Sequence, residues 1–107
     1  MLVLRKSVEF NAVYERGAKT VSRSFVVFAL PNGLRLSRYG LTTPRKLGKA
    51  HDRNRIRRRV KEIIRQAAPN IIPVGFDCVI NPRRSAAERP FIELRDELTT
   101  LLVEALR

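Results

Sequence analysis

The stretch Ile56-Arg57-Arg58-Arg59-Val60-Lys61-Glu62-Ile63-Ile64-Arg65-Gln66-Ala67 carries a long helical pattern that sets the architecture of the chain. Its apolar residues recur at helical spacing and form one stripe: Ile56, Val60, Ile63, Ile64 and Ala67. The spacing predicts an amphipathic helix that stops at Pro69, because proline cannot continue the hydrogen-bond ladder. A helix with one apolar stripe has to pack on another layer, and the flanking segments indicate which layer that is.

Strand-forming segments flank the predicted helix on both sides. Residues 25–30 form a compact apolar run that ends at the turn residues Pro31-Asn32-Gly33. Residues 35–43 are expected to return antiparallel to this run, as its hairpin partner or as another strand of a small sheet. After the helix, residues 76–80 are typical of a short strand, closed by Asn81-Pro82.

Two further helices are predicted near the ends of the chain. The first covers residues 7–16, with Ser7 as its N-cap and Gly17 just past its last turn. Pro90 suits the first turn of the last helix. The apolar stripe of that helix consists of Leu94, Leu98, Leu101, Leu102, Ala105 and Leu106.

The order of elements is therefore helix, strand, strand, helix, strand, helix, with a fourth strand expected in residues 18–24 or 34–43. We predict an α+β fold in which a small mixed β-sheet carries helices packed mainly on one face. The 107 residues contain no linker, repeat or low-complexity segment, so one domain over residues 1–107 is expected.

The charge of the chain points to a polyanionic partner. It has 22 Lys and Arg against 10 Asp and Glu, a net charge of +12. Nucleic acid is the first candidate partner and an anionic membrane surface the second. No apolar stretch approaches the ~20 residues that span a bilayer. The N-terminus also lacks the pattern of a signal peptide, so we expect a cytoplasmic protein without a membrane partner.

Much of this charge is concentrated around the start of the long helix. Residues 45–61 contain nine basic residues and one acidic residue. The helix face opposite the apolar stripe is polar and basic, and consists of Asn54, Arg58, Lys61 and Arg65. Stacked like charges cost a few tenths of a kcal/mol per pair. Their density, and the planar fork of arginine, favour phosphate binding over a merely solvated face.

Asn54 and a set of three aromatic residues can each be interpreted in two ways. Asn54 is either a helix-capping residue or a hydrogen-bonding partner of RNA or of a bound water or ion. Phe10, Tyr14 and Phe28 are explained by core packing one by one, and the sequence pattern alone favours that interpretation. If the three rings converge beside the sheet, they can instead stack on unpaired bases, at ~1–3 kcal/mol for each base.

The sequence lacks the parts of a self-sufficient nuclease. Its acidic residues are scattered, with no close pair to hold two metal ions. Cys78 is the only cysteine and His51 the only histidine, which excludes an internal disulfide and a zinc site without carboxylates. Cys78 lies in an apolar run and is expected to be a buried strand residue. We predict no catalytic residue and no metal ligand in the protein.

One long segment resembles a known family. The stretch Gly40-Leu41-Thr42-Thr43-Pro44-Arg45-Lys46-Leu47-Gly48-Lys49-Ala50-His51-Asp52-Arg53-Asn54-Arg55-Ile56-Arg57-Arg58 is similar to the signature of bacterial ribonuclease P proteins, centred on Arg-Asn-Arg. The segments 10–17, 23–28, 77–80 and 91–94 resemble the family's first helix, first long strand, late strand and last helix. The resemblance covers nearly the whole chain in the expected order.

The resemblance implies a fold and a division of labour. The fold would be an α/β sandwich with a left-handed βαβ crossover. The partners would be the ribonuclease P RNA and precursor tRNA, with no DNA expected. The RNA subunit would bind most of the Mg²⁺ and hydrolyse the phosphodiester bond. The protein would contact that RNA and the single-stranded 5′ leader, and would be inactive alone.

The resemblance also assigns roles to residues. The RNA-binding positions would be Arg45, Lys46, Arg53, Asn54, Arg55, Arg57, Arg58 and Lys61. The leader-binding cleft would consist of Phe10, Tyr14 and Phe28. These assignments favour base stacking over core packing for the three aromatic residues.

Some positions depart from the family pattern, and two other functions remain possible. Tyr14 stands where Phe is common, Phe28 where Tyr is also found, and Pro44 where a small polar residue is usual. His51-Asp52 replaces a more apolar pair, and Asp52 is a candidate helix cap. A ribosomal or other structural RNA-binding protein is the main alternative. A DNA-binding regulator is another, although arginines on both sides of one helix suit phosphate clamping better than base reading.

Overall fold

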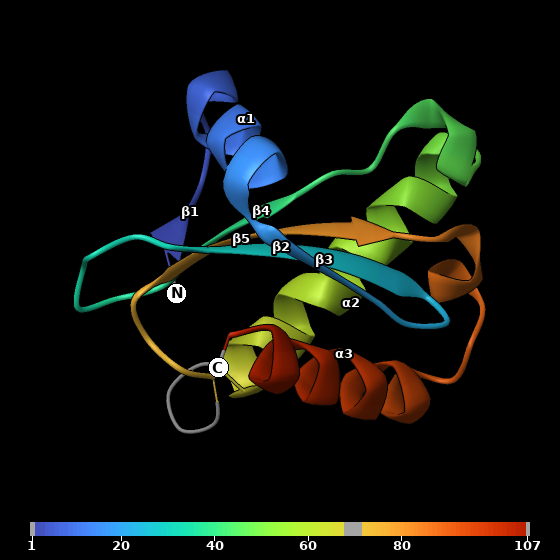
Figure 1. Cartoon of the computed structure of the whole chain (residues 1–107). Coiled ribbons are helices and arrows are strands. Elements are labelled where there is room, and N and C mark those ends of the chain that lie inside the picture. The colour runs from blue at the N-terminus through green and yellow to red at the C-terminus, as the bar shows by residue number, and fades with distance from the viewer. Residues whose placement is uncertain (1, 68–71, 107) are drawn as a thin grey trace.

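Strand β5 (Phe76–Pro82) lies at the centre of a five-stranded mixed sheet in the computed structural model, which describes residues 2–67 and 72–106 (Figure 1). The strand order is β1-β4-β5-β3-β2. The other elements are β1 (Leu2–Val3), α1 (Ser7–Arg16), β2 (Ala18–Val21), β3 (Phe25–Pro31), β4 (Arg38–Leu41), η1 (Arg45–Leu47), α2 (Ala50–Ala67), η2 (Arg84–Ala87) and α3 (Phe91–Ala105). The predicted α+β class and the strand within residues 18–24 are confirmed. The stop predicted at Pro69 lies outside the described residues.

Of the two arrangements predicted for residues 25–30 and 35–43, the hairpin is wrong, and the alternative, two antiparallel strands of one small sheet, is confirmed. Strand β5 separates the two strands: it pairs antiparallel with β3 and parallel with β4. Four consecutive residues of β5 are buried, and a strand buried on both faces needs a hydrogen-bonding neighbour on each side. The connection from β3 to β4 is an open loop, in which the Leu34 N–H donates to Asn32 Oδ1 (2.8 Å). Strand β4, helix α2 and β5 form a parallel βαβ unit, whose left-handed crossover stays a prediction.

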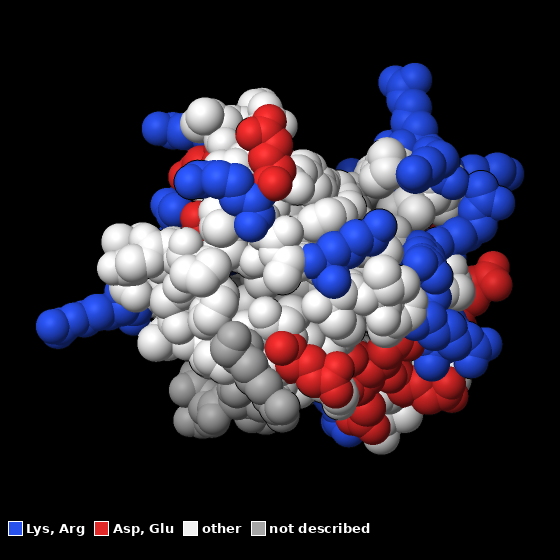
Figure 2. All heavy atoms as spheres, in the orientation of Figure 1, with Lys and Arg blue, Asp and Glu red and all other residues white. Residues whose placement is uncertain are grey.

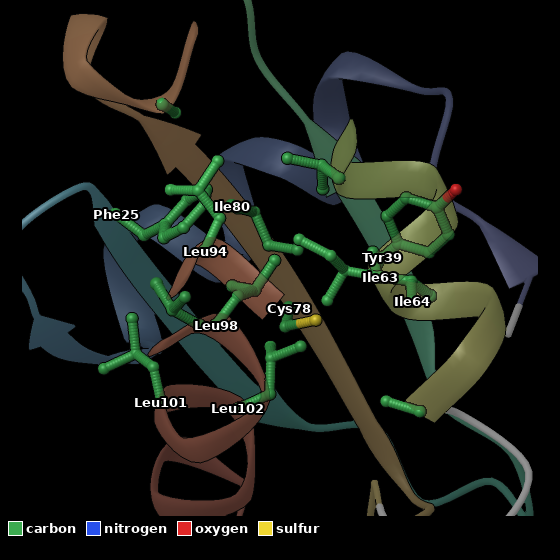
Figure 3. Close-up of a cluster of buried hydrophobic side chains, with 14 of the residues drawn as sticks. Phe25, Tyr39, Ile63, Ile64, Cys78, Ile80, Leu94, Leu98, Leu101 and Leu102 are labelled. Atoms are coloured by element: carbon green, nitrogen blue, oxygen red, sulfur yellow. The ribbon is translucent and has the colours of Figure 1, made fainter. Parts of the chain in front are cut away.

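One face of the sheet is covered by α2 and α3, which enclose the main hydrophobic core (Figure 3). Side chains alternate along a strand, so Cys78 and Ile80 of β5 point into this core together with Phe25 of β3. The apolar stripes of the two helices fill the rest of the layer, and Ile63 and Leu98 are fully buried. Two helices on this face and one on the other agree with the predicted packing.

The opposite face carries α1 and a smaller core. Val13 of α1 packs with Leu4 and with Val79 of β5, which points away from Cys78 and Ile80. The Phe10 ring lies directly on Gly40 of β4, where a Cβ atom would overlap the ring. Because α1 has only ten residues, it covers part of this face and leaves the end near Asn81 open.

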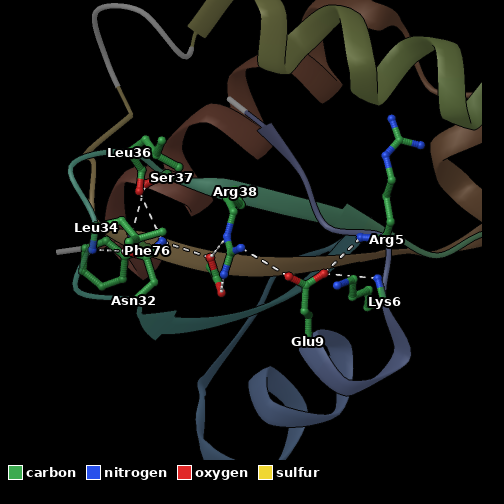
Figure 4. A network of polar contacts seen from close by, with 10 residues as sticks. Arg5, Lys6, Glu9, Asn32, Leu34, Leu36, Ser37, Arg38 and Phe76 are labelled. Atoms are coloured by element: carbon green, nitrogen blue, oxygen red, sulfur yellow. Dashed lines mark hydrogen bonds and ion pairs between the residues drawn. The ribbon is translucent and has the colours of Figure 1, made fainter.

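A polar network fixes the N-terminal end of α1 to the sheet (Figure 4). The Arg38 guanidinium donates to both carboxylate oxygens of Asp77 (2.8 and 2.7 Å) and reaches Glu9 of α1 at 3.2 Å. Asn32 donates a further bond to Asp77 Oδ1 (2.9 Å). Burial opposes ionisation of Asp77, but the bonds from Arg38 and Asn32 outweigh it and hold the pKa of this carboxyl below its ordinary value.

Two predicted helix boundaries need correction. The N-cap of α1 is Lys6 and Ser7 is already helical, because the Glu9 carboxylate accepts the Lys6 N–H (3.1 Å) and supplies the cap. Helix α2 begins at Ala50, so Asp52 lies in its first turn, where a negative charge favours the helix dipole. Strand β5 runs on through Asn81-Pro82 instead of closing before them, since Pro82 still pairs with Phe25 at its end.

Candidate nucleic-acid interface

A cleft opens on the sheet face that α1 leaves uncovered, and it encloses about 830 Å³. Tyr14 of α1 and Phe28 of β3 line it, with ring centroids 5.0 Å apart in an edge-to-face pair at 83°. Tyr14 is 37% exposed and Phe28 is half-buried, so both rings keep surface open to the cleft. Edge-to-face packing fixes the two rings against each other and leaves aromatic surface available for a third ring.

The polar part of the cleft is built around Asn81, at the end of β5. Its Oδ1 accepts hydrogen bonds from the Tyr14 hydroxyl (3.0 Å) and from the Thr42 hydroxyl (2.7 Å). These bonds connect α1 to the ends of β4 and β5. The cleft therefore combines aromatic surface with a fixed amide group.

Cationic side chains surround the cleft: Lys19, Lys46, Arg83 and Arg84 all belong to its lining. The Lys19 ammonium lies 5.9 Å from the centre of the Phe28 ring, close enough for a cation–π contact. Arg84 donates to the Lys46 backbone carbonyl (2.8 Å), which fixes η1 beside the end of the sheet. An anionic strand whose bases enter the cleft would find positive charge along its edge.

A ridge of cations continues from this edge along α2. Figure 2 shows Lys and Arg gathered at the upper right, over η1 and the first turns of α2, whereas Asp and Glu gather over α3. Within residues 2–67 and 72–106, no carboxylate forms an ion pair with any cation of the ridge: Arg45, Lys46, Arg53, Arg55, Arg57, Arg58 and Lys61. Their charge is available to an external anion. Asn54 accepts a hydrogen bond from Arg57 and does not cap the helix.

Two other arginines of α2 have partners inside the protein. Arg59 turns inward and donates to the Ala86 carbonyl (2.9 Å), and burial, together with the nearby Arg55, lowers its pKa. Arg65 forms a two-bond pair with Glu62, and its hydrogen bonds, with one from Gln66, lower the pKa of the Glu62 carboxyl to about 2. Arg59 thus links α2 to η2, and Arg65 pairs within α2, so neither extends the ridge.

The structure brings three of the predicted site residues together in the cleft: Tyr14, Phe28 and Lys46. The other predicted cations lie on η1 and α2, outside the lining of the cleft. Phe10 is one helical turn before Tyr14 and packs on Gly40, outside the lining of the cleft. The lining residues that the sequence reasoning missed include Lys19, Thr42, Asn81, Arg83 and Arg84. For Arg83 and Arg84, the sequence does carry a signal: they are two adjacent arginines directly after a predicted strand.

Two further observations concern metal ligands and the thiol group in the described part of the chain. Among residues 2–67 and 72–106 there is no group of three or more His, Cys, Asp and Glu side chains placed to hold a metal ion. Cys78 is buried in β5 as predicted, and burial raises the pKa of its thiol to about 12, so it is not an activated nucleophile. Over the same residues, no helix has the length and apolar character needed to cross a membrane.

The fold and the site define a class: a small basic α+β protein with an aromatic cleft beside a cationic helix. The chain belongs to the Ribonuclease P family, whose model matches residues 2–106. Relatives named Ribonuclease P protein component include one from Thermotoga sp. (strain RQ2), 38% identical over 92% of this chain and 87% of the relative. Another, from Clostridium botulinum (strain Langeland), is 32% identical over 95% and 92% of the two chains.

Solved structures support the same assignment. The ribonuclease P protein from Thermotoga maritima superposes with a TM-score of 0.87 at 34% identity, covering 97% of each chain. The Staphylococcus aureus ribonuclease P protein covers all of this chain with a TM-score of 0.86 at 24% identity, which supports the fold alone. The fold of this chain is thus shared with these two solved proteins.

Proposed function

We propose that this chain is the protein subunit of cytoplasmic ribonuclease P. In this role it binds the catalytic RNA and the 5′ leader of precursor tRNA, and assists the endonucleolytic removal of the leader that gives mature tRNA 5′ ends. The observation that carries the proposal is that, in this member of the family, the aromatic cleft and the cationic ridge are continuous with each other. Lys46 belongs both to the lining of the aromatic cleft and to the basic segment that leads into α2.

The cleft suits a single strand rather than a duplex. Stacking on Tyr14 or Phe28 requires a base that is not already stacked on its neighbours, and a 5′ leader supplies such bases. The cations at the cleft edge are placed to hold the phosphates of the same strand. Whether Phe10 also meets the leader remains a prediction from the family resemblance.

The ridge on α2 suits the folded RNA subunit. Its arginines carry no ion pair within the described residues and project from a helix whose other face is anchored in the core, so their backbone positions are fixed. Arginine forks bind phosphate oxygens in pairs and impose no base sequence. The proposed contacts are those of Arg45, Lys46, Arg53, Asn54, Arg55, Arg57, Arg58 and Lys61.

We assign the hydrolysis to the RNA subunit and to the Mg²⁺ that it binds. Among the described residues, no group of three or more His, Cys, Asp and Glu side chains is placed to hold such an ion. The protein contributes by binding: it holds the leader and the RNA subunit in one orientation. The isolated protein is expected to be inactive.

The test is cleavage of the 5′ leader from a precursor tRNA at low Mg²⁺, by the cognate ribonuclease P RNA with and without this protein. The proposal expects strong stimulation by the protein and no cleavage by the protein alone. A folded protein that binds RNA but does not stimulate would overturn the proposal in favour of a structural RNA-binding protein. Selective binding to a DNA duplex of defined sequence would favour a regulator instead.

A further inference from the structure

Asn81 has an unusual position in the cleft. It is the last residue of β5 before Pro82, it pairs with Val26 of β3, and its side chain lies on the α1 face of the sheet. The residues near it on that face are mainly apolar or aromatic, including Val26 and Phe28. Asn81 is a half-buried amide in these surroundings, and an amide can distinguish one base from another by hydrogen bonding.

The amide of Asn81 is fixed in one orientation. A carbonyl oxygen has two lone pairs, and the hydroxyls of Tyr14 and Thr42 occupy both. The amide nitrogen, Nδ2, donates to no other residue within 2–67 and 72–106, and it is not among the buried polar atoms that lack a partner. Nδ2 is therefore open to the cleft, and Asn81 presents hydrogen-bond donors there and no acceptor.

The edge of a base that meets this amide follows from the charges around the cleft. Lys46, Arg83 and Arg84 would hold the ribose-phosphate backbone at the edge of the cleft, so a base enters with the side farthest from its ribose. That side carries a keto oxygen in guanine (O6) and uracil (O4), and an amino group in adenine and cytosine. A keto oxygen accepts a hydrogen bond from Nδ2, whereas an amino group at the same place meets another donor. Adenine and cytosine can then accept from Nδ2 only through the adjacent ring nitrogen, which requires a displaced base.

We infer that Asn81 is a specificity-determining residue of the cleft, and that it makes the protein prefer leader bases with a keto group over bases with an amino group. The inference rests on the proposed function, because it takes the cleft's ligand to be the leader. Stacking on Tyr14 and Phe28 supplies affinity for any base, and the Asn81 amide adds the selection. One such hydrogen bond corresponds to roughly a three- to tenfold preference.

The experiment compares two precursors that share one tRNA and differ only in the leader, oligo-uridine against oligo-cytidine. The two bases have the same ring size and differ at C4 and N3, so their stacking is closely matched. Both precursors compete in one reaction with the holoenzyme assembled from the full chain and its cognate RNA. The ratio of their kcat/KM values is divided by the ratio for the RNA subunit alone at high Mg²⁺, which removes the RNA's own preference.

Two variants separate base reading from support of the aromatic pair. Asn81→Asp keeps an oxygen that accepts the Tyr14 and Thr42 hydroxyls but replaces the outward donor with an acceptor, so the preference should reverse toward cytidine. Tyr14→Phe keeps the ring but removes the hydroxyl that donates to Asn81 Oδ1. The Asn81 amide is then no longer fixed in one orientation, so the preference for the uridine leader should shrink toward equality. Asn11→Asp adds the same charge on an exposed part of α1 outside the cleft and should leave the ratio unchanged.

The outcomes are distinguishable from failure of the proposed function. Wild type should favour the uridine leader by roughly three- to tenfold over the RNA-alone baseline. If the holoenzyme is stimulated but wild type and Asn81→Asp give the same ratio, Asn81 only supports Tyr14 and the inference is wrong. If wild type does not stimulate the RNA with either leader, the proposed function itself has failed.

Discussion

The two faces of the sheet differ in how completely they are covered, although the same strands supply both. In β5, Cys78 and Ile80 point into the layer filled by α2 and α3, whereas Asp77, Val79 and Asn81 point toward α1. The first face is closed and apolar. The second changes from a polar network to a small core and then to an open cleft. One face therefore provides most of the stability, and the other, covered by a short helix, has room for a ligand.

A matched pair of truncations tests this difference, and it should give the largest effect. Leu98 of α3 is fully buried in the main core. Leu98→Ala should lower the free energy of unfolding by about 4–5 kcal/mol, near the upper end for such deletions. Leu4→Ala makes the same deletion in the smaller cluster and should cost about 2–3 kcal/mol, because that site can collapse more easily. Urea unfolding of both variants measures the costs, and equal costs would contradict the comparison.

The next effect concerns the open face. Phe28→Ala removes one wall of the aromatic pair and should weaken binding of precursor tRNA to the holoenzyme by about 1–3 kcal/mol. Mature tRNA lacks the leader, so its binding should change much less. The control is Phe91→Ala, which truncates a partly buried ring packed against the other core. It should reduce stability but keep the ratio of precursor to mature affinity. Equal losses for both tRNAs in Phe28→Ala would mean that Phe28 is a core residue.

A third test separates arginines that are free from arginines that are paired. Arg58 is exposed on α2 and forms no ion pair within the described residues, whereas Arg65 on the same helix is bound to Glu62. Arg58→Ala should lower affinity for the RNA subunit and reduce the slope of log K against log salt concentration by ~0.7–0.9, the value for one lost phosphate contact. Arg65→Ala should change the slope less. Salt titrations of both variants would contradict this account if Arg65→Ala gave the larger change.

The local parts of the fold could be predicted from the sequence. The stripe of Ile56 and Val60 marked α2, and the apolar runs marked β3 and β5, because periodicity and apolar runs depend on neighbouring residues alone. The hairpin prediction failed because pairing is not local. Strand β5 comes from residues after α2, and its burial on both faces placed it between β3 and β4.

The same distinction applies to the site. The basic segment and the aromatic residues could be recognised by residue type, and the structure places Tyr14 beside Phe28. Asn81 was missed because Asn-Pro is typical of a strand end, and its importance depends on Tyr14 and Thr42, which are 67 and 39 residues away in the sequence. Arg59 looked like its neighbours in sequence, but it lies beside the apolar stripe and donates to Ala86.

The smallest expected effect concerns the polar network that holds α1 on the open face. Asp77→Asn removes the charge that faces Arg38 and should lower the free energy of unfolding at pH 7 by about 0.5–1 kcal/mol, since the bonds from Arg38 and Asn32 can be kept in part. The pKa of Asp77 is depressed in the folded state, so its contribution is present above the unfolded value near 3.8 and is lost as the pH falls through the folded value.

Wild type should therefore lose stability more steeply than Asp77→Asn below about pH 5, and the two curves should converge in acid. Urea unfolding from pH 7 down to pH 3 measures this convergence. A constant difference at every pH would show that the substitution acts through packing rather than charge. Arg38 also contacts Glu9 of α1, the helix that carries Tyr14. Weakening the bonds between Arg38 and residue 77 should therefore also make the position of α1 less fixed. The two ends of the open face are coupled if Asp77→Asn also reduces discrimination between precursor and mature tRNA.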